Sequence, residues 1–184
     1  VLVGRLPGDL DGLRHPVAQF GTEPIQAALR TGAEVVVCGR CCDAAVFAAW
    51  PMMHGIPAGL ALHAAKIAEC GALCARPAGA NDSLLVTLGP DGFTVEPANP
   101  VRRCTPESVA AHSLYEQPDP ECFYEPEGRI DMRASTFEPC GERVVNRPAH
   151  ELLALQRREQ LVGWPDEPTA ATRGEHDGEG GHAP

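Results

Sequence analysis

The sequence has 184 residues, 43% of them apolar, with only two Trp, two Tyr and five Phe. This length suits one domain of ordinary size plus a tail, and the apolar content excludes a wholly disordered chain. The formal charge of −10 opposes binding to phosphate backbones, and no apolar run reaches the roughly 18 residues that a membrane span needs. We therefore expect neither a nucleic acid nor a membrane as a partner.

Composition divides the chain into three parts. The sequence begins at Val1 with a coil-like stretch, so we expect residues 1–20 to be the remnant of an upstream region. Residues 21–146 carry the alternating signals of an incomplete α/β domain. Residues 147–184 form an atypical tail, with a helix-like stretch at 151–162 and a Gly-, Glu-, His- and Pro-rich end that we expect to be disordered from about residue 165.

The first predicted unit is a helix, a strand, a loop and a second helix. Thr22 is a candidate cap for a helix over residues 23–31, which Gly32 ends. The β-branched run at 34–38 predicts a strand buried on both faces, and an Ala-rich helix follows at about 43–50.

The loop between that strand and the second helix is a candidate ligand site, because ligands gather at the carboxyl ends of strands in α/β sheets. Arg40 and Asp43 flank this loop. One interpretation is a ligand-facing pair, and the other is a mutual salt bridge that caps the helix.

Further elements follow in order. A helix over 59–75 carries an apolar stripe, and the run at 83–96 predicts a hairpin around Gly-Pro-Asp-Gly. Thr105 caps a helix that extends to about Tyr115. The expected fold class is α/β, a mixed sheet with flanking helices in an incomplete domain, with short strands at 122–125, 129–132, 135–138 and 142–145.

The start of the Thr105 helix is a second candidate site. Arg102 and Arg103 stand beside its N-terminus, where free N–H groups favour an anion such as a carboxylate or phosphate. The alternative is ordinary surface arginine. His112 lies further along this helix and is either a catalytic or a structural histidine.

Eight cysteines are scattered along the chain, which favours reduced thiols in a cytoplasm. Cys38 and Cys41 have CxxC spacing, but a second ligand pair at metal spacing is not evident, so packing is the favoured interpretation. Charged Lys66 and Glu69 are expected to face solvent on the 59–75 helix. No signature of a bound cofactor is present, and neither a metal site nor a cofactor is assigned.

Several short motifs occur in a fixed order between residues 21 and 145. The first follows the pattern PI…GADVVI-GR-D-A, and it is carried by residues 24–25, 32–40 and 43–45. Further matches are Lys66, Glu69-Cys70, Asn99-Pro100, Arg103-Cys104-Thr105, residues 108–112, residues 114–116, Gly128 and Asp131-Met132. Together these motifs resemble the acyclic terpene utilisation (AtuA-like) family, whose members are longer.

This resemblance implies a role in the breakdown of branched acyclic terpenes or related acyl compounds, through coenzyme A thioesters. Our first hypothesis is an enzyme, a lyase or hydratase, that acts on a small-molecule substrate in the cytoplasm. Arg40, Arg103 and Thr105 would hold the anionic substrate, and Asp43 or His112 would handle protons. Whether the protein forms a homo-oligomer stays open.

Two other hypotheses stay open. One is a non-catalytic binding or assembly protein of the same pathway, which needs no perturbed acid or base. The other is a thiol-ligated metal protein that uses some combination of Cys38, Cys41, His63, Cys70 and Cys74.

Overall fold

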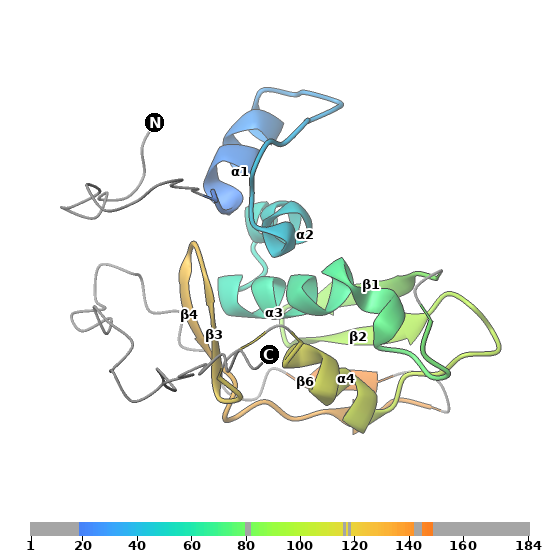
Figure 1. Ribbon diagram of the computed structural model, residues 1–184. Coiled ribbons are helices and arrows are strands. Elements are labelled where there is room, and N and C mark those ends of the chain that lie inside the picture. The colour runs from blue at the N-terminus through green and yellow to red at the C-terminus, as the bar shows by residue number, and fades with distance from the viewer. Residues whose placement is uncertain (1–18, 80–81, 116, 118, 142–144, 149–184) are drawn as a thin grey trace, which may run out of the picture.

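The computed structural model describes residues 19–79, 82–115, 117, 119–141 and 145–148. The predicted upstream remnant, except for its last two residues, lies outside the described residues, as do the 151–162 helix and the tail from 165. Four α-helices and two small antiparallel sheets make up the described part (Figure 1). The expected α/β class is confirmed.

The first helix, α1 (Thr22–Arg30), forms where the sequence predicts it. Its N-cap, however, is Gly21 and not Thr22, whose amide instead donates a hydrogen bond to the carboxylate of Glu127. A side chain at position 21 would collide with that carboxylate, because a Cβ there would lie 2.3 Å from Glu127 Oε1. A larger residue at position 21 would therefore have to displace the Glu127 side chain.

The predicted strand at 34–38 is wrong. This run forms no strand, and Val35 and Val37 are 80% and 91% exposed. A strand needs a neighbour along its length, and here the chain pairs only beyond the run, through a parallel bridge between Phe20 and Cys41. The β-branched residues favour a strand, but among the described residues no neighbouring strand is there to pair with them.

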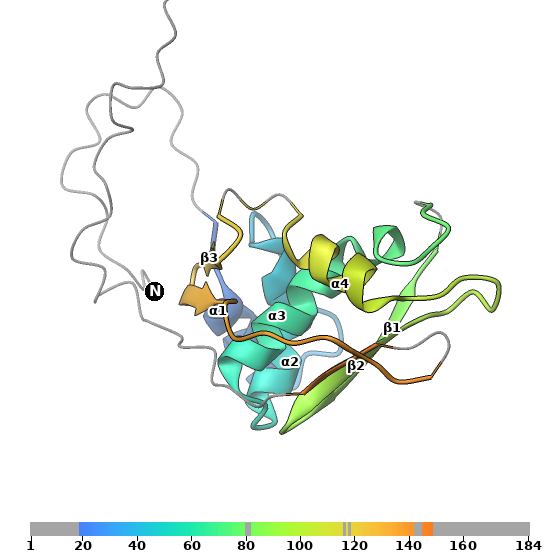
Figure 2. The same cartoon turned by 90° about the horizontal axis from the view of Figure 1, so that it is seen from below.

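Helix α3 (Ala58–Glu69) is the centre of the fold. Every residue from Gly59 to Ile67 is buried, which is the pattern of a helix covered on all sides. It packs against α2 (Asp43–Met53), α4 (Pro106–Ser113) and the first two strands (Figure 2). In the described part α1 packs chiefly on α2, at the outside of this stack.

The predicted 59–75 helix ends earlier than expected. After α3 the chain turns through a short 3-10 helix, η1 (Gly71–Leu73). Gly71 lies against Leu84, and a Cβ at position 71 would come within 2.8 Å of that side chain. The close approach of the next strand thus favours a break at glycine over a continued helix. The predicted apolar stripe is confirmed, because Leu60, Ala64, Ile67 and Cys74 share one core cluster.

The larger sheet has the order β1-β2-β6-β5. Its first two strands, β1 (Leu84–Gly89) and β2 (Gly92–Pro97), form the predicted hairpin, with Gly89 opposite Gly92. The strands β5 (Glu138–Pro139) and β6 (Val145–Pro148) begin later than expected. A separate hairpin of β3 (Cys122–Glu125) and β4 (Gly128–Asp131) packs Phe123 and Ile130 into a second core cluster with α2 and α3.

Candidate active site

The two predicted loop residues lie at the N-terminus of α2. Asp43 is exposed in the first turn of the helix, where a carboxylate interacts favourably with the helix dipole. Arg40 is exposed two residues before the N-cap, Cys42. Among the described residues these two side chains form no salt bridge, so the mutual ion pair is not observed.

The second predicted site lies at the start of α4, and its residues differ in their surroundings. Thr105 forms a capping box with Ser108. A backbone hydrogen bond at Glu107 and, after it, the Thr105 hydroxyl lower the pKa of Glu107. Arg103 is exposed, and its main chain pairs with Arg76. The Thr105 hydroxyl is thus engaged by its own helix.

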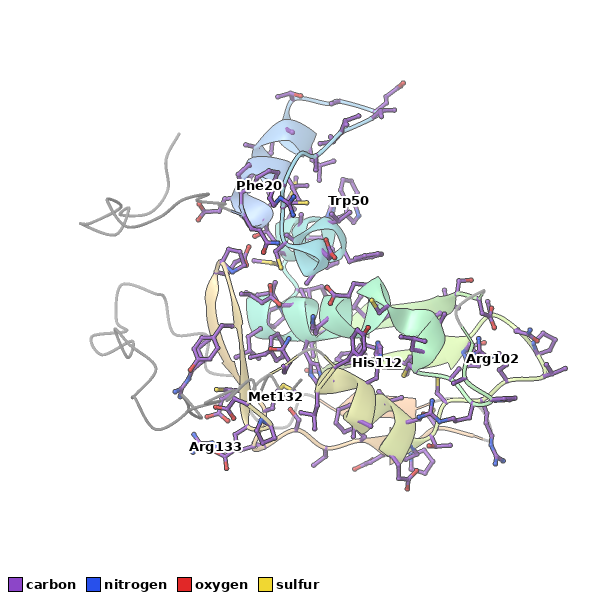
Figure 3. The ribbon with its side chains drawn as sticks, in the orientation of Figure 1. Phe20, Trp50, Arg102, His112, Met132 and Arg133 are labelled. Carbon is purple, nitrogen blue, oxygen red and sulfur yellow. The ribbon has the colours of Figure 1, made fainter. Side chains whose placement is uncertain are left out.

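Arg102 is buried and structural (Figure 3). Its guanidinium donates to Asp82 and to the carbonyls of Pro77 and Ala72, each at 2.8 Å. These bonds join the segment before β1 to the segment before α4. The expected pairing of Arg102 with an anionic ligand therefore does not apply, because its donors are used within the protein.

His112 is buried between α4 and α3 (Figure 3). Its ring stacks on Tyr115 with centroids 5.5 Å apart, and its Nε2 has no hydrogen-bond partner in the described structure. Burial lowers the pKa of His112, an effect that the carbonyl of Ile67 partly opposes. His112 is a neutral core histidine near pH 7, and the structure joins it by no contact to Asp43.

A buried polar cluster lies where α2, α3 and β3 meet. Lys66 and Glu69, in the last turn of α3, form an ion pair with side chains only 9% and 6% exposed. The thiol of Cys42, at the N-cap of α2, donates to the Glu125 carboxylate at 2.6 Å. Glu125 itself is 6% exposed. The expectation that Lys66 and Glu69 face solvent is wrong, because α3 is enclosed on all sides.

Burial and charge set the ionisation of this cluster. Desolvation raises the pKa of Glu125 to about 7, although the Cys42 thiol and the positive charge of Lys66 act in the opposite direction. Desolvation and the bond to Glu125 raise the pKa of Cys42 to about 12. The thiol is thus a donor, and the carboxyl can gain or lose a proton near neutral pH.

Two signals in the sequence point to this cluster. Lys66 is the one cation in the otherwise uncharged stretch from Ala58 to Ala68, and a buried charge requires a partner. Glu125 stands two residues after Phe123, and strand periodicity puts both side chains on one face. The contact between Cys42 and Glu125 cannot be predicted from a local pattern, because 83 residues separate them in the sequence.

An open groove of about 740 Å³ runs beside the cluster, between α3, β1 and Phe47 of α2. This volume lies in the range of small-molecule sites. Its lining is mainly apolar, and Glu69 and Asp82 are its acidic residues. The main wall residues are Ala61, Ala64, Ala65 and Ala68 of α3 and Leu84 and Val86 of β1.

The thiol-ligated metal hypothesis finds no support in the described residues, where no three His, Cys, Asp or Glu side chains are placed to hold an ion. The His63 imidazole instead contacts Ser113 Oγ at 3.0 Å and the ring of Phe93. Cys74 is buried beside Cys104, and their contact raises its pKa. No helix of the described part has the length and apolar character to cross a bilayer.

Comparison with known proteins agrees with the motifs noted above. No curated protein and no solved structure matches the chain significantly. Residues 13–81 match the model of a family described as "Acyclic terpene utilisation family protein AtuA". This segment holds α1, α2 and α3, with Arg40, Asp43, Lys66 and Glu69. The motifs after residue 81 lie outside the matched segment. The 13–81 segment of the chain is thus similar to the acyclic terpene utilisation family.

Proposed function

We propose that this chain is part of a cytoplasmic enzyme that breaks down branched acyclic terpenoid or acyl-CoA compounds, by a lyase or hydratase reaction. The family match of residues 13–81 supports the substrate class. The observation that carries the proposal is the apolar groove with a buried ion pair at its wall, because it offers space for a hydrocarbon chain beside groups that handle charge.

The groove suits a branched chain. Four alanines of α3 line one wall, and their short side chains leave room for methyl branches that a wall of larger residues would exclude. Apolar contact along such a wall contributes about 25 cal/mol for each Å² removed from water.

The charged part of the substrate needs a separate site. Arg40 and Arg103 stay our predicted anion-binding residues, since both are exposed. Arg102 is not a candidate, because its donors are engaged within the protein.

A binding experiment tests the proposal. The protein is titrated with a methyl-branched C10 acyl-CoA, and Ala68→Phe is compared with wild type. Ala68 lines the groove and is only partly buried, so the larger ring should occupy the groove and weaken binding at least about tenfold, or ~1.4 kcal/mol. Ala27→Phe, on the exposed face of α1, is the matched control and should bind normally. Equal affinity of the Ala68 variant would contradict the proposed binding site.

The alternative is a non-catalytic binding or assembly protein of the same pathway. It is favoured by the placement of the predicted proton-handling residues, since Asp43 is exposed on α2 while His112 is buried on α4. Tight binding of the acyl-CoA without any exchange of its α-protons with solvent would support this alternative.

A further inference from the structure

The cluster of Cys42, Lys66, Glu69 and Glu125 is more polar than packing requires. Replacing a buried ion pair by apolar side chains is often neutral or stabilising, so burial of these groups is weak evidence for a stabilising role. Perturbed carboxyl groups beside a cavity are typical of functional sites. The cluster therefore calls for a chemical explanation.

Glu69 connects the cluster to the groove. It is ion-paired with Lys66 inside the protein, and it also lines the groove beside Ala68 and Cys70. Lys66 and Glu125 are not part of the lining. Glu69 is therefore the member of the cluster that a molecule in the groove would contact.

We propose that Glu69 is the general acid–base residue of the groove, and that buried Glu125, held by Cys42, is the group that controls its charge. This inference rests on the proposed function, since it assigns the proton-handling group of that same site. It differs from the sequence-based assignment to Asp43 or His112.

The proposed step is a reversible proton transfer. The Glu69 carboxylate takes the proton from the carbon next to the thioester carbonyl. The C–H electron pair moves toward the carbonyl to give an enolate, and Glu69 becomes a neutral acid that can return the proton to the same carbon. A lyase or hydratase needs this step to break or form a bond at the next carbon, and no electrons leave the substrate.

The charged and titratable groups that face Glu125 come from three places. They are Cys42 of α2, the Lys66–Glu69 pair of α3, and Glu127 in the turn between β3 and β4. When Glu125 is neutral, Lys66 balances Glu69. When Glu125 ionises, the added negative charge makes Glu69 a stronger base, because like charges raise the cost of a second ionised carboxyl.

The test follows exchange of the α-protons of a methyl-branched acyl-CoA in D₂O, by mass spectrometry. Glu69→Gln should slow the exchange about 100-fold or more while the acyl-CoA still binds. Glu125→Gln should keep exchange but remove an inflection near pH 7 from the rate profile, since the inflection arises from Glu125. Glu121→Gln, an exposed carboxyl beside β3, is the control and should match wild type.

A second readout needs no substrate. Alkylation of Cys42, followed by peptide mass spectrometry at pH 8, should be at least about threefold faster in Glu125→Gln, because the thiolate loses a neighbouring negative charge. Thermal melts of each variant check that the fold persists.

The outcomes separate the two proposals. If the acyl-CoA does not bind the wild-type protein, the proposed function fails and the inference fails with it. If it binds and the wild type exchanges the α-protons, but Glu69→Gln exchanges as fast as wild type, the inference alone is wrong. If the wild type binds the acyl-CoA without any exchange, the inference is wrong and the non-catalytic alternative replaces the proposed enzyme. A Cys42 alkylation rate unchanged by Glu125→Gln would refute the controlling role of Glu125.

Discussion

Replacing Glu125 by Gln should change how protein stability depends on pH. The folded structure raises the pKa of this carboxyl from 4.5 to about 7, so the native state binds its proton more tightly than the unfolded chain does. The contribution of this group to stability is fully present below pH 4.5 and is lost as pH rises toward 7. At 1.36 kcal/mol for each pKa unit, the loss is about 3 kcal/mol.

Glutamine keeps the shape of the neutral acid but cannot ionise. The free energy of unfolding of Glu125→Gln, minus that of wild type, should therefore rise by about 3 kcal/mol between pH 4 and pH 8. For a chain of this size that corresponds to a relative Tm increase of about 6–12 °C at the higher pH. Urea denaturation at several pH values, with Glu121→Gln as the control, measures the difference.

A constant difference in the free energy of unfolding between wild type and Glu125→Gln across this pH range would refute the raised pKa of Glu125. That result would mean that Glu125 titrates alike in the folded and unfolded states. Water would then have to reach the carboxyl despite its 6% exposure.

Two further predictions concern residues outside the cluster. Arg102→Lys should destabilise the protein by at least about 2 kcal/mol in urea denaturation. The reason is that a single ammonium cannot reach Asp82 and two carbonyls together. Arg103→Lys, at the exposed neighbour, is the control and should change stability by less than about 0.5 kcal/mol. Asp43→Asn tests the sequence-based assignment of Asp43 as the base against the assignment to Glu69. From its exposed position in the first turn of α2 we expect a loss of stability of up to about 1 kcal/mol with normal α-proton exchange. An exchange about 100-fold slower with an intact fold would make Asp43 the base.

The sequence predicts elements well where local chemistry decides them. The hairpin of β1 and β2 follows from the turn at Pro90 and Asp91, and α4 follows from the cap at Thr105 with proline after it. Such signals act within a few residues. The run at 34–38 fails for the opposite reason, because a strand depends on a partner that no local pattern supplies.

The candidate site was harder to predict. Arg102 and Arg103 are neighbours of the same type, yet one is buried and the other exposed. The bonds of Arg102 to Ala72, Pro77 and Asp82 make this difference, and no local pattern shows them. The Cys42–Glu125 contact joins two elements far apart in sequence. Lys66 is the strongest sequence signal of a buried polar site, since its helix is otherwise free of charge up to Glu69.

The enclosure of α3 has a consequence for the timescale on which its interior meets solvent. In the described part α1 packs chiefly on α2, so it can open locally at small cost, whereas every residue of α3 from Gly59 to Ile67 is buried. Amide protons of α3 should therefore exchange with D₂O only through global unfolding. The Lys66 side chain, which this helix carries on its enclosed part, should share this protection.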